Sequence, residues 1–387
     1  MKQVWFLAWQ SLRFNRLQSV ILVFGLAVTL YLPLAVNGLV ARYQAGLLQR
    51  AATTPLVAGG LGSRFDLVLH ALYFRGRVPR LLKMADVNAL RDTGYAQPIP
   101  LYARYTARRA PVVGTTLDYF TFRQLRLARG QQLLEIGDCV LGPEAAAALN
   151  LAPGDRLMTD PENLFDIAGS YPVNLRVMGV LAPARTPDDG AVFVDLKTAW
   201  LIAGLAHGHS DITGTNADAN VVLSRNATNV TANAALPEVT EVTPENLSSI
   251  HYHGDPEDFP VSAILPVAKD EKSAALLRGR YQGPEATVQI LAARSVVEEL
   301  LGLVFRIKRF FDANAALVAA ATGLFLLLVV VLSLRLRRPE METMFRLGCA
   351  RGLMARLVAA ELAAIGLVSV ALALIGREIT LALVSLW

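Results

Sequence analysis

The sequence predicts an α+β membrane protein, in which a large α+β domain is inserted between the first and second transmembrane helices. Two observations predict this class. Hydrophobic residues make up 53% of the 387 residues and charged residues only 18%, against roughly 25% charged in ordinary globular proteins. In addition, two uncharged runs of 22 residues, Val20–Ala41 and Ala313–Leu334, are each long enough as a helix to cross a hydrocarbon core of about 30 Å.

The first predicted elements are a basic amphipathic lead-in over residues 1–17 and a transmembrane helix over 18–41. The lead-in contains Lys2, Arg13 and Arg16 and no acidic residue. Because basic residues that flank a span favour the cytoplasmic side, we expect the N-terminus in the cytoplasm. The apolar run is long for a signal peptide and no cleavage pattern follows it directly, so we expect an uncleaved helix.

The next predicted element is a folded domain over residues 42–294, on the outer side of the membrane. Between residues 41 and 312, 27 Lys and Arg nearly balance 28 Asp and Glu, which argues against a nucleic-acid partner. Residues 206–260 are poorer in regular pattern and predict an irregular insert. Short β-branched or alternating runs predict strands at 110–116, 138–142, 173–181, 190–196, 219–224 and 286–291. Helices are predicted at Lys83–Thr93 with Asp86 as N-cap, at Pro143–Leu149 and at Leu196–Leu205.

After the domain, the sequence predicts a stalk helix over 295–312 that leads into a second transmembrane helix over 313–334. The stalk pattern fits equally well a helix that lies on the domain core. Residues 335–356 contain six arginines and two glutamates, so we expect them in the cytoplasm. A third transmembrane helix is predicted over 357–375, and the short segment 376–387 leaves a fourth span short or missing.

Motifs of common enzyme classes are absent from the sequence. No GxxxxGK[ST] loop occurs, so we expect that the chain cannot bind and hydrolyse ATP by a P-loop mechanism alone and that it is not an enzyme. GxSxG, HExxH and CxxC are absent as well. Glu361 is the one acidic or basic residue within the predicted spans, and we favour a snorkelling or helix-pairing carboxylate over a mechanistic role for it. A self-sufficient ion-coupled carrier is therefore not indicated.

The cytoplasmic segment predicts a short amphipathic helix. Pro339 suits a first helical position, and Gly348 ends the pattern. Met341, Met344 and Phe345 share one face at i, i+3 and i+4 spacing. Such a helix either docks on a partner protein or lies at the lipid interface, and its residues alone leave both alternatives open.

Several stretches resemble the permease subunits of the MacB/FtsX/LolC superfamily of ABC systems. The first is AWQSLRFNRLQSVILVFGLAV, which is similar to that family's lead-in to its first span. The last is RRPEMETMFRLGCARGLMARLVAAEL, which is similar to its cytoplasmic element and contains Gly348 and Glu361. In the domain, the stretches that carry the likeness are Val112–Leu133, Val140–Leu157 and Leu175–Leu196. The family has four spans, and this sequence departs from it there.

The resemblance implies a multi-pass permease of the bacterial inner membrane with a MacB-like periplasmic domain. It implies a homodimer or heterodimer that works with a separate ABC ATPase subunit and moves its periplasmic domain to expel, extract or regulate a periplasmic partner. The ATPase would dock on a coupling helix through Glu340, Met341, Met344, Phe345, Arg346 and Gly348. The alternative is a membrane-anchored periplasmic module that binds metal or protein without an ATPase.

Four of the five histidines form two His-x-His pairs, His207 with His209 and His251 with His253. In an extended strand, this spacing places both rings on one face, and imidazole is a good ligand for zinc or copper. The pairs lie 44 positions apart, so only the fold can bring them together. Two polar loops that merely contain histidine would give the same pattern, and no other cofactor is indicated.

Overall fold

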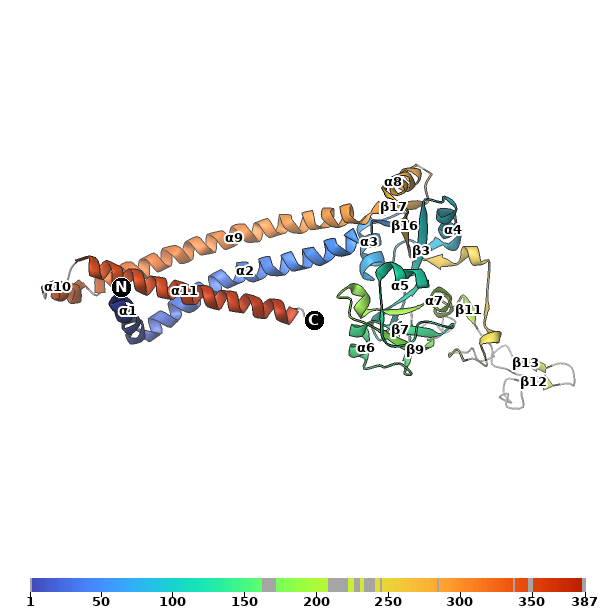
Figure 1. Cartoon of the computed structure of the whole chain (residues 1–387), viewed down its shortest axis with the longest axis horizontal. Coiled ribbons are helices and arrows are strands. Elements are labelled where there is room, and N and C mark those ends of the chain that lie inside the picture. Colours follow the sequence, from blue (N-terminus) through green and yellow to red (C-terminus); the bar gives the residue numbers. More distant parts are fainter. Residues whose placement is uncertain are drawn as a thin grey trace. The chain divides into compact units, whose positions relative to one another are not determined.

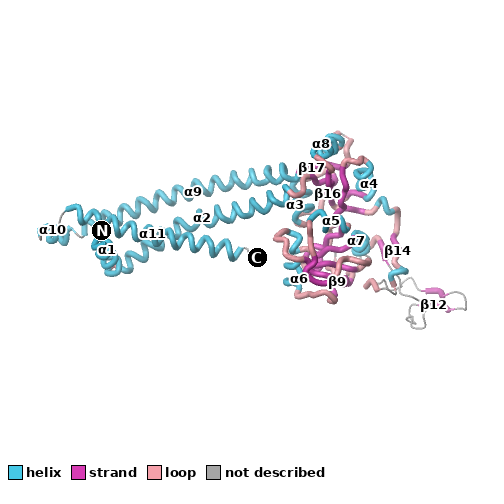
Figure 2. Tube along the Cα trace, in the orientation of Figure 1, coloured by secondary structure: helices cyan, strands magenta, loops and turns pink. Residues whose placement is uncertain are grey.

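The computed structural model describes residues 2–161, 172–207, 222–225, 230–232, 241–243, 246–283, 285–336, 338–346 and 351–384. The chain divides into two compact units, which are described separately. One unit comprises Met1–Leu47 and Leu300–Trp387, and the other comprises Leu48–Glu299. The first unit consists of helices, three of them long, and the second contains the strands, counted over the described residues (Figures 1 and 2).

The helical unit has three helices long and apolar enough to cross a membrane, counted over the described residues. Large apolar side chains along them, among them Phe24, Leu324 and Leu367, are exposed on the protein surface. Such surfaces are stable only when lipid or another protein covers them. The unit's elements are α1 (Lys2–Phe14), most of α2 (Arg16–Ala52), most of α9 (Ala293–Leu336), α10 (Arg338–Arg346) and α11 (Arg351–Val384).

The long helices extend beyond the apolar runs that predict them. Helix α2 continues past residue 41 to Ala52, and α9 joins the predicted stalk to the second apolar run without interruption. Helix α11 continues through Arg377 and Glu378 to Val384, so most of the segment expected as a separate tail is helical. Arg377 and Glu378 form an ion pair at 2.6 Å, which offsets the two charges within this helix.

The domain is built on a mixed sheet of eleven strands within the described residues. The strand order is β17–β1–β16–β3–β5–β10–β7–β9–β6, with β4 beside β5 and β8 beside β9. The pairs β5–β10 and β7–β9 are parallel, and the remaining pairs are antiparallel. The strands are β1 (Leu56–Gly60), β3 (Ala96–Tyr102), β4 (Thr106–Ala107), β5 (Ala110–Thr115), β6 (Leu127–Gly130), β7 (Asp138–Leu141), β8 (Arg156–Met158), β9 (Asn174–Leu181), β10 (Val192–Asp195), β16 (Ala263–Ala268) and β17 (Val288–Ala292).

Short helices pack against this sheet and close its core. The ring of Phe193, on a central strand, contacts the rings of Phe74, Tyr119 and Phe120. Phe193 and Tyr119 are completely buried, so aromatic packing fixes the centre of the domain. The α-helices are α3 (Arg64–Tyr73), α4 (Met84–Asp92), α5 (Leu117–Arg123), α6 (Pro143–Leu149), α7 (Leu196–Ile202) and α8 (Glu271–Arg280).

The remaining elements lie outside the large sheet. Three two-stranded ribbons are β2 (Leu82–Lys83) with β15 (Pro260–Val261), β11 (Ala206–His207) with β14 (His251–Tyr252), and β12 (Val222–Arg225) with β13 (Val230–Ala232). Three 3₁₀ turns are η1 (Pro187–Gly190), η2 (Leu247–Ser249) and η3 (Pro256–Asp258). The predicted irregular insert therefore contains ribbons and turns, and its Val242 and Phe259 are buried.

The mixed α/β character predicted for the domain is confirmed. The strands predicted at 110–116, 138–142, 173–181, 190–196 and 286–291 are β5, β7, β9, β10 and β17, and the three predicted helices are α4, α6 and α7. In the run 219–224, β12 begins at Val222, and residues 219–221 lie outside the described residues. The N-cap prediction for Asp86 is wrong. Asp86 is the third helical residue, and its carboxylate accepts a hydrogen bond from the Lys83 backbone N–H at 2.9 Å, which caps the helix from within.

Candidate functional site

Two long helices connect to the domain through one pair of neighbouring strands. Strand β1 follows α2 closely in the chain, and β17 ends at the residue before α9 begins. The strands pair antiparallel from Leu56 opposite Ala292 to Gly60 opposite Val288. The backbone N–H of Ala293 also donates to the carbonyl of Pro55 at 3.2 Å. The chain segments that lead to the two helices are therefore hydrogen-bonded to each other at one edge of the sheet.

The last turn of α2 is fixed to the domain by a buried ion pair. The Arg50 guanidinium donates to both carboxylate oxygens of Asp188, with Nη1–Oδ2 at 2.7 Å and Nη2–Oδ1 at 2.8 Å. Its Nε donates to the carbonyl of Leu72 at 3.1 Å. The Tyr119 hydroxyl donates to Asp188 Oδ1 at 2.6 Å, and the Thr186 hydroxyl donates to Oδ2 at 2.9 Å. A two-point contact between a guanidinium and a carboxylate, with further hydrogen bonds to each, is a strong geometry for such a pair.

Because this cluster is buried, the pKa of each titratable group in it depends strongly on the charges of its neighbours. Burial alone would raise the pKa of Asp188, but the positive charge and hydrogen bonds of Arg50 outweigh it and hold that pKa below its usual range. Burial and the Asp188 charge both raise the pKa of Tyr119, so its hydroxyl stays protonated and can donate. Removing one partner would leave an uncompensated buried charge, which is costly. We call Arg50, Asp188 and Tyr119 the α2 clamp.

The short amphipathic helix predicted in the segment 335–356 is observed as α10, which lies in the chain between the long helices α9 and α11. Its backbone places Met341, Met344 and Phe345 on one face, as the sequence predicts. The Phe345 side chain is 51% exposed. Thr343 lies on the opposite face and is exposed, and its hydroxyl donates to the Pro339 carbonyl one turn earlier. An apolar face with an exposed aromatic residue is suited to contact with lipid or with a protein.

The structure describes the other predicted ATPase-docking residues only in part. Arg346 is exposed at the end of α10, and the side chains of Glu340, Met341 and Met344 are not described. Gly348 lies outside the described residues. The docking role of all six residues remains a prediction.

Glu361 lines a pocket in the helical unit. The other polar residues of this pocket are Ser11, Asn15, Gln18 and Ser19, from α1, α2 and their connection. The carboxylate of α11 therefore lies near the polar start of the first long helix. This position is the one expected for a helix-pairing residue, and the role of Glu361 stays a prediction.

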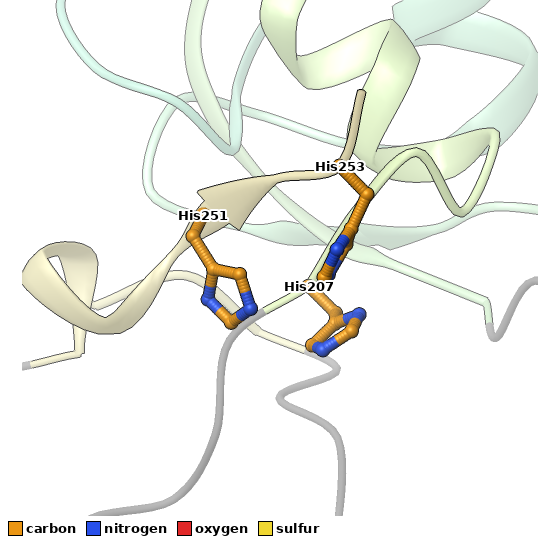
Figure 3. Close-up of side chains that lie close together, drawn as sticks. All are labelled: His207, His251 and His253. Carbon is orange, nitrogen blue, oxygen red and sulfur yellow. The ribbon is translucent and has the colours of Figure 1, made fainter. Parts of the chain in front are cut away.

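Three of the predicted metal-binding histidines lie together at the ribbon formed by β11 and β14 (Figure 3). The ribbon pairs His207 directly with His251, and His253 follows two residues later on the same face. The ring centroids are 4.8 Å apart for His207 and His251, 4.6 Å for His207 and His253, and 4.8 Å for His251 and His253. The fold therefore brings together residues from both His-x-His pairs. His209 lies outside the described residues.

The fifth histidine has a different environment. His70 is buried, and its Nε2 lies 2.8 Å from the Ser262 hydroxyl oxygen. That hydroxyl donates its proton to the Leu101 carbonyl at 3.0 Å, so His70 Nε2 must donate to it. Burial lowers the pKa of His70 to about 4. His70 is thus a neutral structural residue of the core.

The sequence alone gave no indication of the α2 clamp. Arg50 follows the first apolar run within one helix and is indistinguishable in sequence from an ordinary flanking arginine. Asp188 lies in the turn TPDDG, where acids are common on the surface. A basic residue needs a partner where the end of its helix is buried, but the burial of the end of α2 is a property of the fold.

Comparison with known proteins yields one family match and similar solved structures. A family model described as the MacB-like periplasmic core domain matches residues 20–239. The chain is similar to the periplasmic region of MacB from Actinobacillus actinomycetemcomitans, with a TM-score of 0.37 and 14% identity over 66% of this chain and 97% of that chain. It is also similar to the extracellular domain of the noncanonic ABC-type transporter YknZ from Gram-positive bacteria, with a TM-score of 0.32 and 12% identity over 61% of this chain and 98% of that chain. No curated protein sequence matches.

Proposed function

The chain belongs to the MacB/FtsX-like family of ABC transporter permeases, and we propose that it is a permease subunit that couples ATP hydrolysis on a separate subunit to motion of its periplasmic domain. The family match covers more than half of the chain, from the first apolar run into the insert. The helices with exposed apolar surfaces support placement in a bacterial inner membrane. The excess of basic residues in the segments 1–17 and 335–356 supports a cytoplasmic location of both segments and a periplasmic location of the domain.

The single observation that carries the mechanical part of the proposal is the α2 clamp. Helix α2 is continuous from Arg16 to Ala52, and Arg50 in its last turn is bound at two points to the buried Asp188. An α-helix transmits an axial displacement because each turn is hydrogen-bonded to the next. Movement of α2 would therefore reach the turn that contains Asp188 directly.

The pairing of β1 with β17 provides a second connection between the long helices and the domain. Because Leu56 pairs with Ala292, the ends of α2 and α9 next to the domain cannot separate without breaking ladder hydrogen bonds. The first turns of α9 are also anchored, since Ala293, Val296 and Val297 are buried. In this proposal, a displacement of both helices moves the domain as a body, and the domain acts on a substrate or partner in the periplasm by efflux, extraction or regulation.

The input to this motion would come from a separate ATPase that docks on α10. The helix lies in the chain between α9 and α11, so a force on it acts on two long helices at once. Its apolar face would enter the ATPase surface, and Glu340 and Arg346 would flank that contact. A homodimer or heterodimer of permease chains would cover part of the exposed apolar helix surface, and lipid would cover the rest.

The alternative function is a membrane-anchored periplasmic module that binds metal or protein without an ATPase, and the histidine cluster favours it. Affinity purification of the full chain in mild detergent distinguishes the two. We expect an ATPase with a GxxxxGK[ST] loop to co-purify with the chain and to hydrolyse ATP in the complex. If the intact chain is recovered repeatedly without such a subunit, also from membranes solubilised in the presence of nucleotide, the permease proposal is wrong and the module remains.

A further inference from the structure

We propose that His207, His251 and His253 bind one divalent transition-metal ion, zinc or copper, at the base of the insert in the periplasmic domain. The three side chains offer one ligand nitrogen each, and these atoms all lie within 4.8 Å of one another. This site is independent of the ATP-driven function proposed above.

The backbone sets the positions of all three imidazoles. His207 and His251 are opposite each other in the antiparallel ribbon. The N–H of His253 donates to the carbonyl of Leu205 at 2.9 Å, which extends the same pairing by one more position. His251 and His253 therefore occupy neighbouring positions on one face, and His207 faces both of them (Figure 3).

The spacing is close to what a metal requires. Two nitrogens bound at 2.0–2.1 Å in tetrahedral geometry are about 3.3 Å apart. The ligand atoms of the cluster must therefore approach each other by about 1.5 Å at most, given the 4.8 Å limit. His251 and His253 are exposed, so rotation of their side chains can provide this movement without disturbing a packed core.

The hydrogen bonding of His251 favours metal binding through its other nitrogen. Its Nδ1 lies 3.0 Å from the carbonyl oxygen of Ser249, which can only accept a hydrogen bond. Nδ1 therefore carries the proton, and Nε2 presents its lone pair. A ring nitrogen that donates to a backbone carbonyl is the usual support of a metal-binding histidine.

The donor set determines the class of metal. Three neutral imidazoles suit zinc and copper and disfavour calcium and magnesium, which prefer oxygen ligands. Copper(II) should bind more tightly than zinc, as the general affinity order predicts. Two nearby carboxylates are already engaged, because Asp258 pairs with Lys83 at 2.7 Å and Asp255 caps η3 through the Glu257 N–H at 3.0 Å. Three protein ligands leave a coordination position for water or for a ligand from solution.

A metal bound at this site would also cross-link two parts of the chain that are far apart in sequence. His207 and His251 are the residues at which the chain enters and leaves the long segment 208–250. A metal bound to both would cross-link the two ends of this segment and constrain it as a disulfide would. Metal loading should therefore raise the thermal stability of the domain as well as fill the site.

The test uses the full chain in mild detergent, purified without a polyhistidine tag and stripped of metal with a chelator. After equilibrium dialysis against micromolar zinc, elemental analysis should find about one zinc per chain. His207→Ala, His251→Ala and His253→Ala should each weaken the binding at least tenfold, and the triple variant should retain no stoichiometric zinc. The matched control is Asp258→Asn, which changes a neighbouring polar side chain outside the cluster and should bind like the wild type.

Copper provides an independent readout of the ligands. Copper(II) added to the metal-free chain should give an electron paramagnetic resonance spectrum with hyperfine coupling to imidazole nitrogens, and this signal should disappear in the triple variant. Gel filtration and circular dichroism establish that each variant is folded. Less than a fifth of an equivalent of zinc on the wild type would overturn the proposal, and so would unchanged zinc and copper binding by a folded triple variant.

Discussion

Two of the ion pairs formed by helix residues, Arg50–Asp188 and Arg338–Glu342, have opposite surroundings. In the α2 clamp, Arg50 and Asp188 are 5% and 1% exposed and bind each other at two points, whereas in α10 Arg338 and Glu342 are 77% and 62% exposed and approach only to 3.7 Å. The charged groups of the first pair are shielded from solvent and hydrogen-bonded to protein atoms, whereas those of the second pair remain exposed to solvent. The Arg50–Asp188 pair is therefore a packed contact inside the domain, whereas the Arg338–Glu342 pair on α10 is an exposed surface contact.

Removing one charge of the α2 clamp should therefore lower the free energy of unfolding strongly. Asp188→Asn keeps the shape of the side chain but leaves the Arg50 guanidinium buried without a counter-charge, which costs about 3–5 kcal/mol. Urea unfolding of the full chain in detergent, followed by the fluorescence of the buried Trp200, measures the loss. We expect the midpoint to fall strongly.

A double variant controls for this interpretation. Arg50→Met combined with Asp188→Asn removes the unpaired charge as well, so it should recover part of the stability lost in Asp188→Asn alone. If Asp188→Asn unfolds at the wild-type urea concentration, the buried pair does not hold α2 to the domain.

The pH dependence of the domain's stability should reveal the contribution of His70, a buried titratable group outside the α2 clamp. Its pKa is about 4 in the folded domain because of burial, against about 6.5 in an unfolded chain. The unfolded chain therefore binds the extra proton first, so the stability contribution is complete above about pH 6.5 and is lost as the pH falls toward 4. The difference amounts to about 3 kcal/mol.

Unfolding midpoints of the wild type and His70→Gln, measured between pH 7 and pH 4, test this prediction. The variant is expected to be less stable at pH 7, because the buried Ser262 hydroxyl loses its imidazole partner. Its midpoint should nevertheless fall less steeply with acid than that of the wild type. Parallel curves for the two proteins would show that His70 does not stay neutral in the core.

The exposed pair on α10 should contribute little by comparison. Glu342→Gln removes an i,i+4 contact that is screened by water, so the free energy of unfolding should change by about 0.5 kcal/mol or less. The same urea experiment measures it. A loss of unfolding free energy close to that of Asp188→Asn would contradict this expectation, because it would mean that Glu342 makes a buried contact.

Local patterns in the sequence predicted much of the fold, because they depend on neighbouring residues. Alternation predicts β9, and Pro143 at a first helical position predicts α6, which begins and ends where expected. Strand order could not be predicted in this way, since β1 pairs with β17 across more than 200 positions. The length of α11 was underestimated because Arg377 and Glu378 neutralise each other within the helix.

The candidate sites show the same limit. The residue types at the ribbon indicated metal chemistry, but only the pairing of β11 with β14 brings His207 to His251 and His253. For the α2 clamp, neither Arg50 nor Asp188 is unusual in its local sequence, and their pairing across 138 positions depends on the packed domain. Burial and long-range pairing are properties of the fold that a local pattern does not contain.

The most direct test of the proposed coupling compares two carboxylates placed on opposite faces of α10. Phe345→Asp puts a charge into the apolar face, and Thr343→Asp puts the same charge on the opposite, exposed face. Burying a large apolar side chain stabilises a contact by roughly 1.5–3 kcal/mol, so a buried charge there should release the ATPase. We expect the ATPase to co-purify with the wild type and with Thr343→Asp and to be lost from Phe345→Asp. Full retention by Phe345→Asp, or equal loss from both variants, would contradict it.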